Sequence, residues 1–197
     1  MGEQVIINDV GPRDGLQNQD RVLAVQARLQ LISAIRGSGL NHIEVGSFVS
    51  PKVVPAMAGT DAVVGGLAAV GEGHYSALIP NMRGYELARA AGVKTAVMVL
   101  YGSEGMARKN VNMSRLQADE VTESILLQAR QDGIAVIATI GVAFGCPFDG
   151  PVAPGLVADV AGKFLDLGVD RFVLADTIAA ANPLQVRELT GRLVAEH

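Results

Sequence analysis

The densest group of side chains capable of chemistry lies near the start of the chain, in the segment Asn8–Gln17. In its sequence, NDVGPRDGLQ, a Gly-Pro pair is followed directly by Arg13 and Asp14. Arg13 carries a permanent cation suited to an oxyanion, and Asp14 offers a hard oxygen ligand suited to a divalent metal. The same residue types are ordinary turn formers, so a turn with a surface Arg–Asp pair is the alternative interpretation.

Segments predicted to be strands must position these residues. Short runs rich in β-branched residues recur at roughly 30-residue spacing, the length of a strand, a crossover helix and their loops. Each run is almost continuously apolar, as expected for strands of a parallel sheet that is covered on both faces. The six predicted strands are Gln4–Val10, Asn41–Ser47, Tyr75–Pro80, Lys94–Leu100, Ile134–Ile140 and Arg171–Ala175.

Amphipathic stretches between these runs predict the covering helices. Arg21–Ser38 and Ser114–Asp132 each place aliphatic residues on one stripe, and a sixth helix is predicted over Pro183–Glu196. Several helices are followed by a glycine at the position of a left-handed C-terminal cap. These glycines are Gly39, Gly92, Gly133 and Gly168.

Two architectures accommodate six consecutive βα units, an open doubly wound sheet and part of an eight-unit barrel. Nearly every predicted strand ends in polar or unusual residues, which favours the barrel, because in a barrel nearly every strand end contributes to the site. We therefore predict an α/β fold of the TIM (β/α)8 barrel type, with about six of the eight βα units present. We assign residues 1–197 to a single partial barrel domain.

Composition restricts the partners. The net charge is −4, and Lys and Arg are scattered rather than clustered, so neither nucleic acid nor an anionic membrane is an expected partner. No apolar run spans a bilayer and no export signal is recognised, so we expect a cytoplasmic protein. The single cysteine, Cys146, cannot form an internal disulfide. These properties favour a small-molecule partner.

The motifs of this chain, taken in order, resemble those of 3-hydroxy-3-methylglutaryl-CoA (HMG-CoA) lyases. VGPRDGLQNQ over residues 10–19 and IEVGSFVSPKVVP over residues 43–55 carry most of the resemblance, which covers essentially the whole chain. Shorter matching motifs are Pro80-Asn81, Lys109-Asn110, Gly145-Cys146-Pro147-Phe148 and Asp176-Thr177-Ile178. The resemblance implies a TIM-barrel, metal-dependent carbon–carbon lyase that cleaves HMG-CoA into acetyl-CoA and acetoacetate. It also implies a place in leucine degradation and ketone body metabolism.

The resemblance further implies roles for individual residues. Asp14 is expected to bind a divalent metal, Mg²⁺ or Mn²⁺. Arg13 is expected to stabilise the thioester enolate, and Glu44 to support Arg13 and the reacting groups, so that Arg13, Glu44 and Asp14 are the predicted catalytic residues. The predicted substrate-binding or supporting residues are Gln17, Ser47, Asn81, Asp176 and Thr177.

Structural alternatives stay open at several of these positions. The carboxylate of Asp176 can simply cap the next helix. Arg108 and Lys109 suit either a CoA phosphate or a solvated basic pair. Cys146 lies in a Gly-Cys-Pro turn and is expected to be a turn or packing residue, since the catalytic cysteine of the resembled lyases lies on a later loop.

The chain also departs from the resembled family. The remaining metal ligands of those lyases are a His-x-His pair after the seventh strand and an Asn after the eighth. Neither is present, so we expect a chain truncated before the seventh strand. Asp9 stands where a glutamate is usual, Ile137–Thr139 where Arg-Gly-Tyr is usual, and Ala179–Asn182 where a glycine-rich stretch is usual. These departures leave the identity of the acyl-CoA open.

Two other functions therefore stay open. One is a related metal-dependent aldolase, lyase or acyltransferase that acts on another acyl-CoA. The other is a catalytically inactive, truncated CoA-binding module. The expected partner in the first interpretation is an acyl-CoA substrate, and association into a homo-oligomer is also left open.

Overall fold

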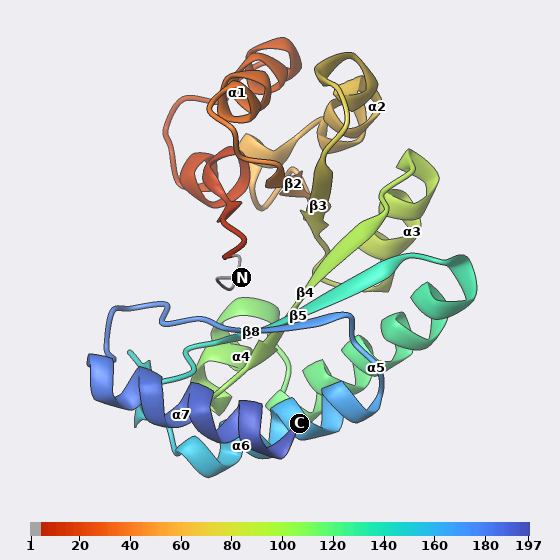
Figure 1. Ribbon diagram of the computed structural model, residues 1–197. Coiled ribbons are helices and arrows are strands. Elements are labelled where there is room, and N and C mark those ends of the chain that lie inside the picture. Colours follow the sequence, from red (N-terminus) through yellow and green to blue (C-terminus); the bar gives the residue numbers. More distant parts are fainter. Residues whose placement is uncertain (1–4) are drawn as a thin grey trace. The chain divides into compact units, whose positions relative to one another are not determined.

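The structure is a computed structural model that describes residues 5–197, and its chain divides into two compact units (Figure 1). The first unit is Met1–Ala96 and the second is Val97–His197. The assignment of residues 1–197 to a single domain stays a prediction.

The first unit alternates strands with helices. β1 pairs in parallel with β2, and β2 pairs in parallel with β3. Its elements are β1 (Asn8–Asp9), a π-helical turn η1 (Gly11–Gly15), α1 (Val25–Gly37), β2 (His42–Ser47), a 3-10 turn η2 (Pro55–Met57), α2 (Thr60–Val70), β3 (His74–Leu78) and α3 (Met82–Ala91).

The core of the first unit lies between β2 and the helices α1 and α2. It is built from aliphatic side chains that recur on one stripe of each helix and on the outward face of β2. These residues are Ile32, Ile43, Val45, Val63 and Leu67. Full burial of one such side chain contributes about 1.5–3 kcal/mol, so this layer fixes β2 firmly against its helices.

The second unit has the same alternation. β5 lies between β4 and β8 in the sheet and pairs in parallel with β8. Its elements are β4 (Thr95–Tyr101, which begins two residues before the division), α4 (Glu104–Val111), α5 (Arg115–Asp132), β5 (Ala135–Gly141), β6 (Gly145–Cys146), β7 (Gly150–Pro151), α6 (Pro154–Asp166), β8 (Arg171–Leu174) and α7 (Pro183–Glu196).

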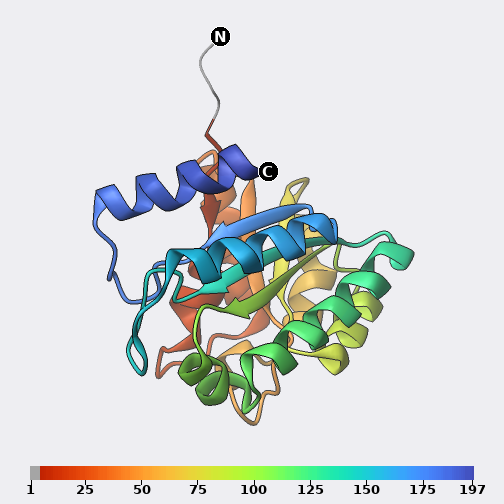
Figure 2. The ribbon, with the colours of Figure 1, turned by 90° about the horizontal axis from the view of Figure 1, so that it is seen from below.

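Helices α5 and α6 cover one face of the strands of the second unit (Figure 2). Phe164 of α6 and Ile125 of α5 are fully buried, as is Val136 of β5. α6 also packs against α7 and β8. Within the described residues, no helix is long and apolar enough to cross a membrane.

The six predicted βα units are present, three associated with each unit of the structure. The final helix has the predicted bounds, and the four predicted cap glycines all have positive φ angles, between 67° and 97°. The short antiparallel pair β6–β7 was not predicted. Its two strands have only two residues each, too few to produce a recognisable pattern.

The first predicted strand is largely wrong. Residue 4 lies outside the described residues, and the strand of the structure is only Asn8–Asp9. The side chains of Val5, Ile6 and Ile7 are 82%, 55% and 62% exposed. An apolar run predicts a strand only if that strand is covered, and these side chains are not.

Candidate functional site

The Gly-Pro-Arg-Asp motif forms a tight turn directly after β1. The backbone carbonyl of Val10 accepts hydrogen bonds from the N–H groups of Arg13 (3.1 Å) and Asp14 (2.7 Å). The carboxylate of Asp9 accepts a hydrogen bond from the N–H of Gly11 at 2.9 Å. Pro12 is buried within the turn. The turn thus fixes the backbone from which Arg13 and Asp14 extend.

The guanidinium of Arg13 is held between two carboxylates. Its Nε donates a hydrogen bond to Oε1 of Glu44, which lies on β2. Its Nη1 donates to Oδ1 of Asp14 at 2.7 Å. The side chain of Glu44 is 4% exposed, whereas that of Asp14 is 58% exposed. Nη2 makes neither of these bonds.

The environment of Glu44 raises the pKa of its carboxyl group above the ordinary value. Burial is the largest cause, since removal from water disfavours the charged form. The charge and hydrogen bond of Arg13 act in the opposite direction, and the nearby carboxylate of Asp14 adds to the increase. Arg13 therefore offsets only part of the effect of burial on the pKa of Glu44.

The other residues predicted in the first unit have different surroundings. Ser47 is buried, and its hydroxyl has no hydrogen-bond partner among the described residues. Asn81 caps α3, because its Oδ1 accepts a hydrogen bond from the N–H of Gly84 at 2.9 Å. Gln17 lies partly exposed just after the η1 turn.

Ser47 also borders a largely apolar cavity of about 400 Å³. The lining includes Phe48, Met57, Thr60, Leu87 and Ala90.

The two predicted residues of the second unit bind backbone groups of their own unit. The carboxylate of Asp176 accepts hydrogen bonds from the N–H groups of Ala180 (2.8 Å) and Ala181 (3.1 Å). Oγ1 of Thr177 accepts a hydrogen bond from the N–H of Val142 at 2.9 Å. The alternative in which Asp176 caps the next helix is wrong, because Asn182 caps α7.

Cys146 is a free, buried cysteine, as expected for a packing residue. The hydroxyl of Ser103 donates a hydrogen bond to its sulfur at 2.9 Å, and the N–H of Phe148 donates at 3.4 Å. Burial alone would raise the pKa of this thiol, but hydrogen bonds from Ser103, Phe148 and Asp149 lower it below the ordinary value. The hydrogen bond of Cys146 thus connects residues 145–149 to Ser103, the residue that caps α4.

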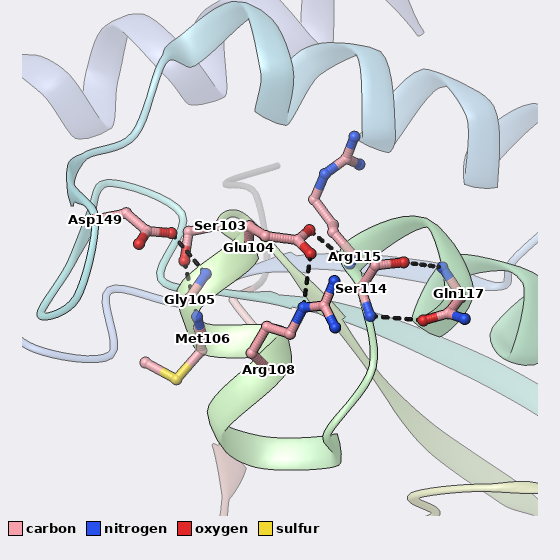
Figure 3. Close-up of polar contacts among 9 residues, drawn as sticks. All are labelled: Ser103, Glu104, Gly105, Met106, Arg108, Ser114, Arg115, Gln117 and Asp149. Atoms are coloured by element: carbon pink, nitrogen blue, oxygen red, sulfur yellow. Dashed lines mark hydrogen bonds and ion pairs between the residues drawn. The ribbon is translucent and has the colours of Figure 1, made fainter.

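Two carboxylates whose contacts were not predicted from the sequence bind backbone N–H groups at the starts of α4 and α5 (Figure 3). Asp149 accepts a hydrogen bond from the N–H of Gly105 at 2.7 Å, in the first turn of α4. Glu104 accepts one from Nε of Arg108 at 3.1 Å and one from the N–H of Arg115 at 2.9 Å. Arg108 is therefore one half of an exposed ion pair. The four-residue spacing of Glu104 and Arg108 is a signal that could have identified this pair.

Asp14 supplies the kind of oxygen ligand that Mg²⁺ and Mn²⁺ prefer. One of its oxygens already accepts a hydrogen bond from Arg13. Across residues 5–197, no group of three or more His, Cys, Asp or Glu side chains is placed to hold a metal ion. The described residues therefore fit one ligand position rather than a complete metal centre.

Comparison with known proteins reveals extensive similarity. The sequence model of the family described as HMGL-like matches residues 4–197. The chain is 42% identical to the (R)-citramalyl-CoA lyase of Chloroflexus aurantiacus and 41% identical to the hydroxymethylglutaryl-CoA lyase of Pseudomonas mevalonii. Each alignment covers 95% of this chain and 62% of the relative, so the chain spans about three fifths of the length of these relatives.

A solved structure agrees with this similarity. The crystal structure of hydroxymethylglutaryl-CoA lyase from Pseudomonas aeruginosa superposes with a TM-score of 0.92 at 38% sequence identity. The match covers 98% of this chain and 64% of the other chain. The predicted TIM-barrel type of fold is thereby confirmed.

Proposed function

The chain belongs to the HMGL-like family, and from this premise we propose that it acts as a carbon–carbon lyase that cleaves HMG-CoA into acetyl-CoA and acetoacetate. The observation that carries the proposal is the ion pair of Arg13 with the buried Glu44, beside Asp14. It places a fixed cation and an exposed carboxylate on one turn of the first unit. The similarity to lyases that act on two different acyl-CoA compounds supports the same reaction type.

The proposed reaction requires stabilisation of negative charge on the thioester. A base removes the proton of the tertiary hydroxyl group, and the carbon–carbon bond breaks as that oxygen becomes the ketone of acetoacetate. The electron pair of the broken bond passes to the acetyl-CoA enolate, which then takes a proton. The enolate charge exists only as the bond breaks, so a cation that meets it lowers the barrier directly.

Arg13 is the residue that we assign to this charge. Glu44 and Asp14 hold two nitrogens of its guanidinium, which leaves Nη2 to donate a hydrogen bond to the thioester oxygen. A cation that is already oriented needs no rearrangement at the moment of reaction. Loss of one such donor in an oxyanion site typically costs about 10²–10³-fold in rate.

We also propose that the reaction uses Mg²⁺ or Mn²⁺ and that Asp14 is one of the ligands. Such a cation would polarise the oxygen atoms of the substrate. The support is the exposed carboxylate of Asp14, next to the arginine that we assign to the enolate. Because Arg13 donates to one oxygen of Asp14, metal binding at this residue is expected to alter the Arg13–Asp14 pair.

A second substrate is supported by a specific observation. The (R)-citramalyl-CoA lyase is as similar to this chain as the HMG-CoA lyases are. The departures at Ile137–Thr139 and Ala179–Asn182 also leave the acyl group open. Cleavage of the equivalent bond in citramalyl-CoA releases pyruvate instead of acetoacetate, so the products distinguish the two substrates.

The experiment is to incubate the purified chain with either acyl-CoA, in Mg²⁺ or Mn²⁺ and in a chelator control. Acetoacetate from HMG-CoA that disappears with the chelator supports the proposal. Pyruvate from citramalyl-CoA alone would move the proposal to that substrate. Binding of either acyl-CoA without cleavage would instead support a binding module.

The metabolic setting is proposed from the same reaction. Release of acetoacetate from HMG-CoA would place the protein in leucine degradation and ketone body metabolism. A cytoplasmic location is likewise proposed, and the single free cysteine, Cys146, is compatible with a reducing compartment. Fractionation of cells that express the natural protein tests this location.

A further inference from the structure

Arg28 of α1 is buried in an unusual way. Its residue exposure is 0%, which places it among the largest fully buried side chains of the described residues. Its hydrogen bonds all go to neutral oxygens, namely the carbonyls of Ala58 (3.0 Å) and Val45 (3.2 Å) and the hydroxyl of Thr60 (3.2 Å). Its Nε has no partner among the described residues.

A buried guanidinium without a carboxylate partner is costly, because charged groups are strongly stabilised by water. Burial accordingly lowers the pKa of Arg28 below the ordinary value. An aliphatic side chain on the same helical stripe would avoid this cost. The hydrogen bonds of Arg28 are therefore the feature that an aliphatic side chain cannot replace.

One of those bonds reaches an irregular point of β2. The pairing of β2 with β3 shifts register between Glu44 and Gly46, so that Val45 has no paired residue on β3, as in a β-bulge. A bulge redirects the side chains around it and leaves backbone groups without ladder partners. Nη2 of Arg28 donates to the carbonyl of Val45, the residue directly after Glu44.

The packing around Gly46 shows how closely Arg28 approaches the bulge. A Cβ atom at Gly46 would lie 2.6 Å from Nη2 of Arg28 and 2.7 Å from Oγ1 of Thr60. Residue 46 must therefore be glycine for Arg28 to reach the Val45 carbonyl. Helix α1, the bulge and the start of α2 thus meet at one guanidinium.

We propose that Arg28 is a positioning residue for the Arg13–Glu44 pair, and that it acts by holding the Val45 carbonyl and so fixing the direction of Glu44. Arg28 bonds to none of the proposed catalytic side chains and acts through the backbone of β2. The kinetic consequence rests on the proposed lyase function, whereas the structural consequence does not.

The test compares Arg28→Met and Arg28→Lys with Arg36→Met as the matched control. Arg36 lies on the same helix, but its Nη1 donates to the hydroxyl of Tyr75 rather than to the bulge. The first readout is the NMR signal of the Arg13 Nε–H group, assigned by its loss in Arg13→Gln. Its hydrogen exchange is slow where the bond to Glu44 is intact.

We expect exchange of the Arg13 Nε–H to become at least about tenfold faster in Arg28→Met and to stay unchanged in Arg36→Met. Arg28→Lys, which retains the charge but carries its donors on a single nitrogen, should fall between them. Should Arg28→Met fail to fold, faster exchange in Arg28→Lys supports the proposal. Unchanged exchange in whichever Arg28 variant folds would overturn it.

The second readout is kinetic. In a chain that cleaves its acyl-CoA, Arg28→Met should lower kcat by about tenfold, through misplacement of Glu44 and Arg13, and change KM little. Faster Nε–H exchange with unchanged kcat would overturn the proposal that Arg28 affects catalysis through Glu44 and Arg13. If the parent chain cleaves neither acyl-CoA but the exchange result holds, the lyase proposal fails and the positioning role stands.

Discussion

The predicted catalytic residues of the first unit and the predicted binding residues of the second unit have different hydrogen-bond partners. In the first unit, the side chains of Arg13, Glu44 and Asp14 bond to one another. In the second unit, Asp176 and Thr177 accept hydrogen bonds from backbone N–H groups. A polar side chain in such a position can therefore bind other side chains or bind the backbone. The sequence pattern alone does not distinguish these two cases.

The backbone of the second unit explains what its polar residues do. Val142 and Ala179 have φ angles of 53° and 54°, in the left-handed region that residues with a Cβ atom rarely adopt. Thr177 holds the N–H of Val142, and Asp176 holds the N–H group directly after Ala179. These side chains stabilise a strained backbone, whereas those of the first unit leave a cation and a carboxylate for a ligand.

The largest difference between substitutions in the two units is expected in the affinity for a metal ion. Asp14→Ala should lower the affinity for Mn²⁺ at least about a hundredfold, because loss of even a residue that only orients a metal ligand costs 10–100-fold. Asp176→Ala should leave this affinity unchanged. Both are measured by the electron paramagnetic resonance of free Mn²⁺. Equal affinities in the Asp14→Ala variant and the parent chain would remove Asp14 as a ligand.

A smaller effect, on stability, is expected in the second unit. Asp176→Ala should lower the free energy of unfolding by about 1–2 kcal/mol, because two backbone N–H groups lose an ionised acceptor. The control is Asp159→Ala, at an exposed aspartate of α6. Urea denaturation gives both values. If the two variants were equally stable, the hydrogen bonds of Asp176 to backbone N–H groups would not contribute to the stability of the fold.

Relief of backbone strain gives a further, smaller change. Ala179→Gly should raise the free energy of unfolding by about 0.5–1 kcal/mol, because glycine adopts a positive φ without the steric penalty of a Cβ atom. Ala181→Gly at a nearby position is the control, since its φ is not positive. Destabilisation by Ala179→Gly would show that the left-handed conformation carries no relievable strain.

The pH dependence of stability tests the burial of Glu44. Its pKa is raised in the folded state, so the folded chain binds this proton more tightly than the unfolded chain does. The resulting stabilisation is complete below the ordinary value of 4.5 and is lost as the pH rises through the raised pKa. The stability of the parent chain relative to Glu44→Gln should therefore fall over this window. A constant difference would contradict the raised pKa.

Periodicity and caps predicted most of the fold. Helix α7 begins at Pro183 and ends at Glu196 as predicted, because its capping box and amphipathic stripe are local features. The length of the first strand was overestimated, because the sequence does not show whether other elements cover Val5–Ile7, and these residues are exposed. The irregularity between Glu44 and Gly46 arises from the pairing of β2 with β3. The sequence of β2 alone therefore contains no pattern that predicts it.

The site was predicted more unevenly. The motif around Arg13 and Asp14 identified the pair, and the structure joins it to Glu44. Arg28 was missed, although it lies three residues after Val25 and four before Ile32 on the apolar stripe of α1. A charged residue on such a stripe is a signal of burial. Its contact with the Val45 carbonyl is a tertiary feature that no local pattern contains.

The most direct test of this account is the rate of acyl-CoA cleavage by Arg13→Gln, with Arg83→Gln as the matched control. Arg83 is another arginine of the first unit, but its ion pair with Glu86 is exposed. We predict that Arg13→Gln lowers kcat by about 10²–10³-fold, and that Arg83→Gln changes neither kcat nor the free energy of unfolding by a measurable amount. Turnover by Arg13→Gln near that of the parent chain would contradict the assignment of Arg13 to the enolate.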